Sequence, residues 1–150
     1  MQMHGTLLSP FTRKVRVLAA ERGLDLPLVA AEVGTHVPLA GPAQDALSAL
    51  NPLIKIPVLI GVAGGPLYDA AVICAFLDAL GPGPRLIPTG VARWPVLRLQ
   101  ALADGMVEAA LLCRFEARRP PAQQDPDWIA AQQRRLRQGL DALEAEAAAL

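Results

Sequence analysis

Hydrophobic and polar positions in the first third of the chain predict a strand, a helix and a second strand in turn. The apolar segment 1–8 is typical of a short buried strand. Ser9 followed by Pro10 is typical of a helix start, because serine caps the free N–H groups there and proline fits the first helical position. Apolar residues at helical spacing follow as far as Gly23, which predicts the helix end. The segment 26–33 predicts the second strand.

The next part of the chain predicts a short helix, two strands and a longer helix. After a stretch broken by glycine and proline, residues 43–50 favour a short helix. The β-branched run 56–60 predicts a strand, and a glycine-rich turn then leads to a short partner strand over 66–68. Residues 69–80 carry apolar side chains on one helical face, with Asp69 as the expected cap.

Two long helical patterns make up the rest of the chain. Residues 81–90, with the sequence GPGPRLIPTG, predict a linker because three prolines and three glycines interrupt any regular element. The helical patterns that follow run over 91–119 and 126–150. Pro120 and Pro121 predict the break between them.

The order βαβ, then ββα, then helices only, predicts an α/β thioredoxin-like N-terminal domain followed by an all-α C-terminal helical region. A parallel βαβ unit needs a right-handed crossover, and helices must cover the faces of its sheet. We expect the thioredoxin-like domain over 1–80, the linker over 81–90 and the helical region over 91–150.

Composition excludes several classes of function. The formal net charge is zero, with 14 basic and 14 acidic residues, which gives no electrostatic case for nucleic acid or an anionic membrane. Hydrophobic residues make up 53% of the chain, enough for a packed core, yet no apolar run is long enough to span a bilayer. Cys74 and Cys113 lie far apart, so neither a zinc site nor a disulfide framework is predicted. With no signal peptide visible, we expect a cytoplasmic protein without metal.

Three short motifs carry the candidate chemistry. At Ser9, a helix N-terminus would stabilise an anion such as a thiolate, and the hydroxyl could donate a hydrogen bond to it; a plain cap is the alternative. At Ile56-Pro57, a cis peptide would leave the Ile56 backbone free to pair with an extended peptide, whereas a trans edge-strand proline is the alternative. At Asp69, the carboxylate could accept from an ammonium group, or it could only cap its helix.

These motifs, in this order, resemble the glutathione S-transferase family. The segments SPFTRKVRVLAAERGL, NPLIKIPVL and LYDAAVICAFLD are similar to its N-terminal domain. The segments RLQALADGMVEAALLCRFEARRP and WIAAQQRRLRQGLDALEAE are similar to helices four and five of small bacterial members. The resemblance implies glutathione as co-substrate, an electrophilic small molecule as second substrate, and a homodimer.

The resemblance also assigns roles to individual residues. It implies that the Ser9 hydroxyl supports the glutathione sulfur as a hydrogen-bond donor and is not itself a nucleophile. The expected glutathione-binding residues are Phe11, Lys55, Ile56, Pro57, Asp69 and Ala70.

The sequence departs from the family pattern at three points. Ala70 stands where the family usually has serine, so a hydroxyl contact to the γ-glutamyl carboxylate is lost and weaker glutathione binding is expected. Ile54 replaces the usual glycine before Lys55, which predicts a different path for that loop. The chain also lacks about three further helices that the family normally has, so we expect exposed apolar faces and a greater tendency to self-associate.

A few other residues are candidates for a function or for a structural role. Thr6 and Thr12 are alternatives to Ser9 for supporting the thiol. We expect the two cysteines to be structural thiols and assign no role to His4 or His36. A charged cluster predicts either a solvated helix end or a rim for a polar substrate; its members are Arg114, Glu116, Arg118 and Arg119. Two acidic residues one helical turn apart, Asp104 and Glu108, could line a cleft or face a partner.

Two other functions compete with transfer chemistry. A non-catalytic scaffold protein with weak or lost glutathione binding is favoured by Ala70 and by the missing helices. A thiol-disulfide oxidoreductase is the third hypothesis, and the lack of a cysteine beside Ser9 argues against it.

Overall fold

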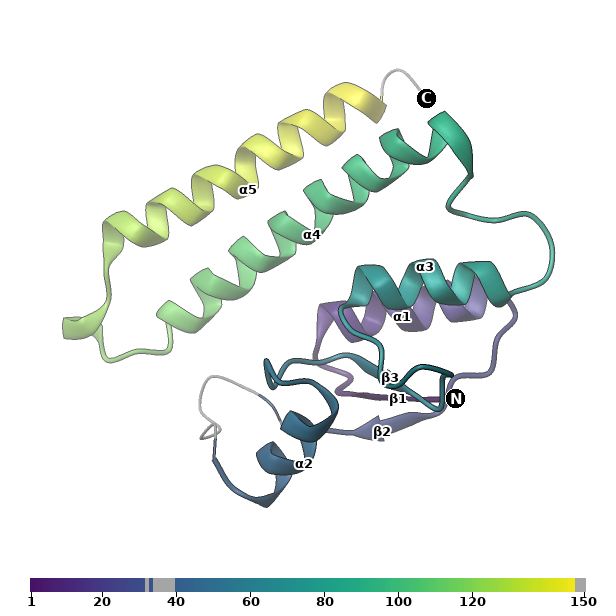
Figure 1. Ribbon diagram of the computed structural model, residues 1–150. Coiled ribbons are helices and arrows are strands. Elements are labelled where there is room, and N and C mark those ends of the chain that lie inside the picture. Colours follow the sequence, from purple (N-terminus) through teal and green to yellow (C-terminus); the bar gives the residue numbers. More distant parts are fainter. Residues whose placement is uncertain (32, 34–39, 148–150) are drawn as a thin grey trace. The chain divides into compact units, whose positions relative to one another are not determined.

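The computed structural model describes residues 1–31, 33 and 40–147 (Figure 1). The chain divides into two compact units, Met1–Gly90 and Val91–Leu150. The first unit contains the β-sheet and the helices that pack on it, and the second is built around a pair of long helices. This is the predicted architecture of a thioredoxin-like domain followed by a helical region.

In the described part of the first unit, three short strands form one mixed sheet in the order β2-β1-β3. They are β1 (Gln2–Gly5), β2 (Leu28–Ala30) and β3 (Val58–Ile60). β1 and β2 run parallel and are joined through α1 (Pro10–Glu21), which confirms the predicted βαβ unit. β3 runs antiparallel to β1.

The predicted strand over 66–68 is wrong as a regular strand. Leu67 alone pairs with Leu59, through two backbone hydrogen bonds of 2.8 and 2.9 Å, and forms an isolated antiparallel bridge. The connection between them contains Gly61, Gly64 and Gly65 at positive φ, where the chain turns too sharply for a longer ladder.

Two helices of the first unit lie against each other above the sheet, α1 and α3 (Ala70–Leu80) (Figure 1). The third, α2 (Pro42–Leu50), precedes β3 and begins one residue before its predicted start. The buried apolar side chains of β1, β3, α1 and α3 share one core. Its members are Met3, Val15, Ala19, Leu59, Ala70, Ile73, Cys74 and Leu77.

A buried ion pair holds the segment after α3 against α1 and α3. Arg22, at the C-terminus of α1, lies with its Nε 3.3 Å from the Asp78 carboxylate, and both side chains are at most 4% exposed. Arg22 also donates to the carbonyls of Gly81 and Pro84. Asp78 accepts from the Leu86 N–H at 2.9 Å and from the Ile87 N–H at 3.0 Å. The first part of the expected linker is therefore bound firmly to α1 and α3.

The second unit is an antiparallel helical hairpin of α4 (Arg93–Glu116) and α5 (Pro126–Ala147), with a short 3-10 turn at Pro121–Gln123 between them. Another 3-10 turn, Gly90–Ala92, begins at the last residue of the first unit and leads into α4. The predicted break at the two prolines is confirmed. The helices approach closely at Gly139, where an added Cβ would lie 2.5 Å from the Met106 Cγ atom. Among the described residues, no helix combines the length and the apolar character that a membrane span requires.

Candidate functional site

The sheet register brings the three sequence motifs to one edge of the sheet. β3 is antiparallel to β1 with His4 opposite Val58, so the residues before β3 lie beside the carboxyl end of β1. α1 begins a few residues beyond that end, at Ser9. Since Leu67 is bridged antiparallel to Leu59, the chain after Leu67 runs back toward Pro57. The starts of α1, β3 and α3 therefore meet at the same edge.

Ser9 caps α1 through its side chain, as predicted. Its Oγ accepts a hydrogen bond from the Thr12 N–H at 3.2 Å, and its carbonyl accepts from the Arg13 N–H at 3.0 Å. A hydroxyl oxygen that accepts one hydrogen bond can still donate its own proton. The half-buried Ser9 hydroxyl therefore combines a donor with the partial positive charge of a helix N-terminus.

The two threonine alternatives to Ser9 differ in accessibility. Thr12 is fully buried, and its Oγ1 has no hydrogen-bond partner within the described ranges. Thr12 packs so closely on Gly5 that an added Cβ on the glycine would lie 2.6 Å from that oxygen. Thr6 is half-buried, and its hydroxyl accepts a long hydrogen bond of 3.4 Å from the Leu8 N–H. Thr12 is thus a core residue that solvent does not reach.

The Ile56–Pro57 peptide bond is cis, which the sequence could not establish. Pro57 is buried and Ile56 is half-buried. The pairing of β3 with β1 begins at Val58, so the predicted strand over 56–60 is two residues shorter and Ile56 lies outside the ladder.

The loop before Ile56 is organised by Asn51, a residue to which sequence reasoning gave no role. Asn51 is 2% exposed; its Oδ1 accepts from the Leu53 N–H at 3.0 Å and its Nδ2 donates to the Lys55 carbonyl at 2.9 Å. Its own carbonyl accepts from the Ile54 N–H at 2.8 Å. The signal in the sequence was an Asx-turn residue directly after a helix and before a proline.

Ile54 lies in the left-handed region with φ of 52°, where the family resemblance expects glycine. A β-branched residue is rare in that region, because its Cβ crowds the backbone. Residue 54 therefore takes a backbone conformation that glycine favours, and the expected different path of the loop stays a prediction. The side chain of Lys55 is exposed.

Asp69 caps α3, also as predicted. One oxygen of its exposed carboxylate accepts from the Ala71 N–H at 3.0 Å and from the Val72 N–H at 3.3 Å. The peptide bond before Asp69, from Tyr68, is cis. Ala70 is buried in the core, so a ligand at this helix start would meet the backbone N–H of residue 70 and not its side chain.

The other expected residues take structural positions. Phe11 is half-buried and packs against the core, and Cys74 is part of that core. Cys113 is half-buried, with its Sγ 3.9 Å from the carbonyl of Ile129. Among the described residues, no three His, Cys, Asp or Glu side chains are grouped so that they could hold a metal ion. His36 lies outside the described residues, and His4 on β1 is half-buried.

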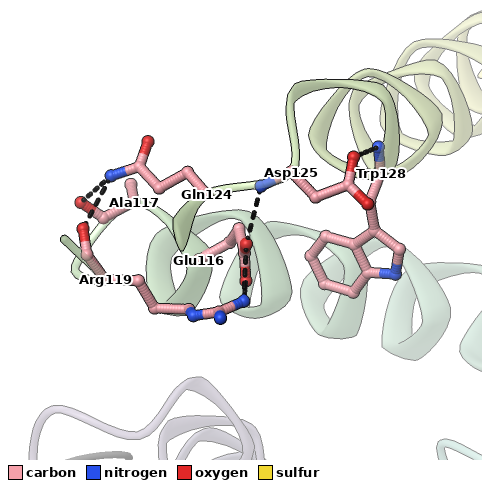
Figure 2. Close-up of polar contacts among 6 residues, drawn as sticks. All are labelled: Glu116, Ala117, Arg119, Gln124, Asp125 and Trp128. Carbon is pink, nitrogen blue, oxygen red and sulfur yellow. Dashed lines mark hydrogen bonds and ion pairs between the residues drawn. The ribbon is translucent and has the colours of Figure 1, made fainter. Parts of the chain in front are cut away.

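The charged cluster at the end of α4 forms part of the turn to α5. Figure 2 shows Glu116 accepting hydrogen bonds from the Arg119 guanidinium and from the Asp125 N–H, both at 2.9 Å. Asp125 in turn caps α5 by accepting from the Trp128 N–H at 3.0 Å, and the Gln124 amide donates to the Arg119 carbonyl at 2.8 Å. These contacts fit the structural interpretation of a helix end.

The remaining charged candidates lie on α4, except Arg118, which follows its C-terminus. Arg114, Arg118 and Glu108 are exposed, and Asp104 is half-buried. Their expected roles at a cleft or toward a partner stay predictions.

The chain is similar to known proteins over nearly its whole length. Residues 8–80 match the family model "Glutathione S-transferase, N-terminal domain". The uncharacterized GST-like protein YibF of Escherichia coli (strain K12) is 30% identical over 145 residues, which cover 96% of this chain and 68% of that protein.

Two solved structures are similar in both sequence and fold. A glutathione transferase family member from Pseudomonas fluorescens Pf-5, with bound glutathione, is 41% identical with a TM-score of 0.88, over 99% of this chain and 72% of that one. A glutathione S-transferase from Methylobacillus flagellatus KT, also with glutathione bound, is 38% identical with a TM-score of 0.83, over 96% and 68% of the two chains.

Proposed function

Since this chain belongs to the glutathione S-transferase family, we propose that it binds glutathione at the shared edge of its sheet and activates the thiol for attack on an electrophilic small molecule. The observation that carries the proposal is the convergence of Ser9, Ile56-Pro57 and Asp69-Ala70 at one edge of one sheet. Glutathione is a tripeptide with a thiol in its centre and a charged γ-glutamyl end. Its site therefore needs a donor for the sulfur, a backbone partner for the peptide and a polar partner for the charged end.

Ser9 would act on the sulfur. Its hydroxyl donates a hydrogen bond to the thiolate, and the helix N-terminus adds partial positive charge, so that the anion is favoured over the thiol. The thiol proton leaves to solvent, and the sulfur lone pair forms the new bond to the electrophilic carbon. The leaving group or the acceptor takes up the electron pair displaced from that carbon.

The backbone and the acidic residue would hold the rest of the tripeptide. The Ile56 N–H and carbonyl pair with the cysteinyl backbone, as an added strand pairs with a sheet edge. The Asp69 carboxylate accepts from the γ-glutamyl ammonium, while the N–H of Ala70 donates to its carboxylate. Phe11, buried Pro57 and exposed Lys55 would shape the surroundings of the bound peptide.

A non-catalytic binding protein is the second candidate, and Ala70 favours it. The missing hydroxyl would remove one hydrogen bond to a charged group, worth about 1.5–3 kcal/mol, from the γ-glutamyl end. Weak binding with no turnover would follow if the remaining contacts are too few.

The first test is a calorimetric titration of the purified chain with reduced glutathione, followed by an assay with an activated aryl chloride. Ser9→Ala is expected to lower turnover about tenfold or more, because a donor to the developing anion is lost. Ser48→Ala is the matched control, since that exposed hydroxyl bonds the Asp45 carbonyl within α2. Saturable binding without turnover would support the second candidate, and an unchanged rate in Ser9→Ala would remove Ser9 from the mechanism.

We also propose that the protein works as a homodimer in the cytoplasm. The solution mass measured on the sample used for the titration tests the dimer, and a monomer that binds glutathione would contradict it.

A further inference from the structure

The side-chain amide of Asn51 uses both of its ends. Its Oδ1 accepts from the Leu53 N–H, and its Nδ2 donates to the Lys55 carbonyl. The orientation of the amide is fixed by these partners, because an N–H needs an oxygen opposite it and a carbonyl needs a donor. The side chain is buried, so water does not compete for either bond.

The two bonds have different consequences. The bond to the Leu53 N–H closes an Asx turn, which any short side chain with a suitable oxygen can do. The bond to the Lys55 carbonyl reaches beyond the turn and is not needed to close it. It acts on the residue next to Ile56.

The Lys55 carbonyl and the Ile56 N–H belong to the same peptide plane. This peptide is trans, so the two groups point in opposite directions. A donor that holds the carbonyl therefore also sets the direction of the N–H, which points away from Asn51. Hydrogen bonding at the carbonyl also polarises the amide and strengthens its N–H as a donor.

We propose that Asn51 is a positioning residue of the glutathione site, which orients the Ile56 N–H toward the ligand backbone. The inference rests on the proposed function, because it concerns the peptide group that would pair with the cysteinyl backbone of glutathione. Asn51 itself does not touch the ligand.

Two variants separate positioning from loop closure. Asn51→Asp keeps the acceptor for the Leu53 N–H but places a second oxygen opposite the Lys55 carbonyl, where the two repel each other. Asn51→Ser keeps a turn-forming oxygen and is too short to reach residue 55. If the aspartate variant does not fold, the serine variant still tests the proposal.

Leu47→Ala is the control for stability alone. Leu47 is buried on α2, so its truncation leaves a cavity and lowers the unfolding temperature, while the Asn51 side chain and its partners at residues 53 and 55 are retained. All variants are titrated calorimetrically with reduced glutathione. The amide resonance of Ile56 is followed in ligand-free, nitrogen-15-labelled protein.

We expect both Asn51 variants to bind glutathione about tenfold more weakly, because a misdirected Ile56 N–H loses its hydrogen bond to the ligand. The Ile56 amide resonance of the ligand-free variants should also be shifted. Leu47→Ala should keep the wild-type affinity and resonance. Wild-type affinity in both Asn51 variants, or an equal loss in Leu47→Ala, would overturn the proposal. If the wild-type chain does not bind glutathione, the proposed function fails, and so does the role of Asn51 in positioning a ligand. An amide shift confined to the Asn51 variants would then show only that Asn51 orders its loop.

Discussion

An ion pair from each unit of the chain allows a direct comparison. In the first unit, Arg22 and Asp78 are 4% and 2% exposed, and both also bond backbone groups of the following segment. In the second, Arg98 and Glu146 form a bidentate pair with two contacts of 2.7 Å, but they are 59% and 36% exposed. The same chemistry thus occurs inside the first unit and on the surface of the second.

The difference follows from how much each unit can bury. The first unit encloses a core of large apolar side chains between its sheet and two helices. In the described part of the second unit, the buried residues are Ala109, Gln132 and Gly139, whereas Trp94 and Leu140 are exposed. A two-helix hairpin has one interface and no second layer, so its stability depends on close helix contact and on its polar turn.

Asp78→Ala should give the largest effect. It leaves the buried Arg22 guanidinium without a counter-charge and two backbone N–H groups without an acceptor, so the free energy of unfolding of the first unit should fall by about 3–5 kcal/mol. Urea unfolding followed by circular dichroism measures it. Glu146→Ala, at the exposed pair, is the matched control; equal losses in both variants would contradict the comparison.

A pair of glycine substitutions tests close helix contact in the second unit. Gly139→Ala should lower the stability of the hairpin by about 1 kcal/mol, because the new Cβ meets the Met106 side chain. Gly105→Ala on α4 meets nothing within 4 Å and should raise stability by about the same amount through helix propensity. The unfolding temperatures of both variants test this expectation. An equal rise in unfolding temperature for both would show that the helices can move apart freely.

The loop of the candidate site offers a smaller test in the first unit. Ile54→Gly should be more stable than Ile54→Ala by about 1 kcal/mol, because glycine alone accepts a φ of 52° without a Cβ clash. Both variants lose the Ile54 contacts beyond Cβ, so their difference in urea unfolding reports the cost of a Cβ at this backbone conformation. Equal midpoints would mean that the left-handed conformation is not retained.

The exposed pair should give the smallest effect, and it should depend on pH. The hydrogen bond from Arg98 lowers the pKa of Glu146 below its usual value of 4.5. A carboxylate with a lowered pKa stabilises the folded state above pH 4.5, and this contribution is lost as pH falls through the folded-state pKa. Arg98→Ala should therefore lower the melting temperature slightly at pH 7, and the difference from wild type should shrink as the pH falls below 4.5. A difference that does not change with pH would have to come from packing.

Most helix boundaries could be predicted because their signals are local. Helix starts are marked by Ser9 and Asp69, whose side chains accept hydrogen bonds from backbone N–H groups within three residues. The break after α4 is marked by two prolines, which have no backbone N–H to donate. The strand over 66–68 was predicted wrongly, because strand length depends on a partner elsewhere in the chain.

The residues that sequence reasoning missed act over longer distances. Arg22 falls at the same helical spacing as the apolar residues of α1, and nothing nearby in the sequence indicates that its partner is Asp78. Asn51 was visible as a turn residue, but its bond to the Lys55 carbonyl requires the folded loop. Ser9 and Asp69 were predicted correctly as caps, and their roles toward glutathione stay predictions.

The contacts of Arg22 and Asp78 with the segment after α3 have an evolutionary consequence. Both side chains bond main-chain carbonyls and N–H groups of residues 81–87, and nearly every amino acid supplies these groups. The anchoring therefore recognises the path of the chain and not the identity of its side chains. Among homologues we expect two charged positions that change only together. In the segment beside them, Gly81, where a Cβ would clash with Arg22, and the buried Ile87 should be constrained, and the exposed residues between them should vary freely.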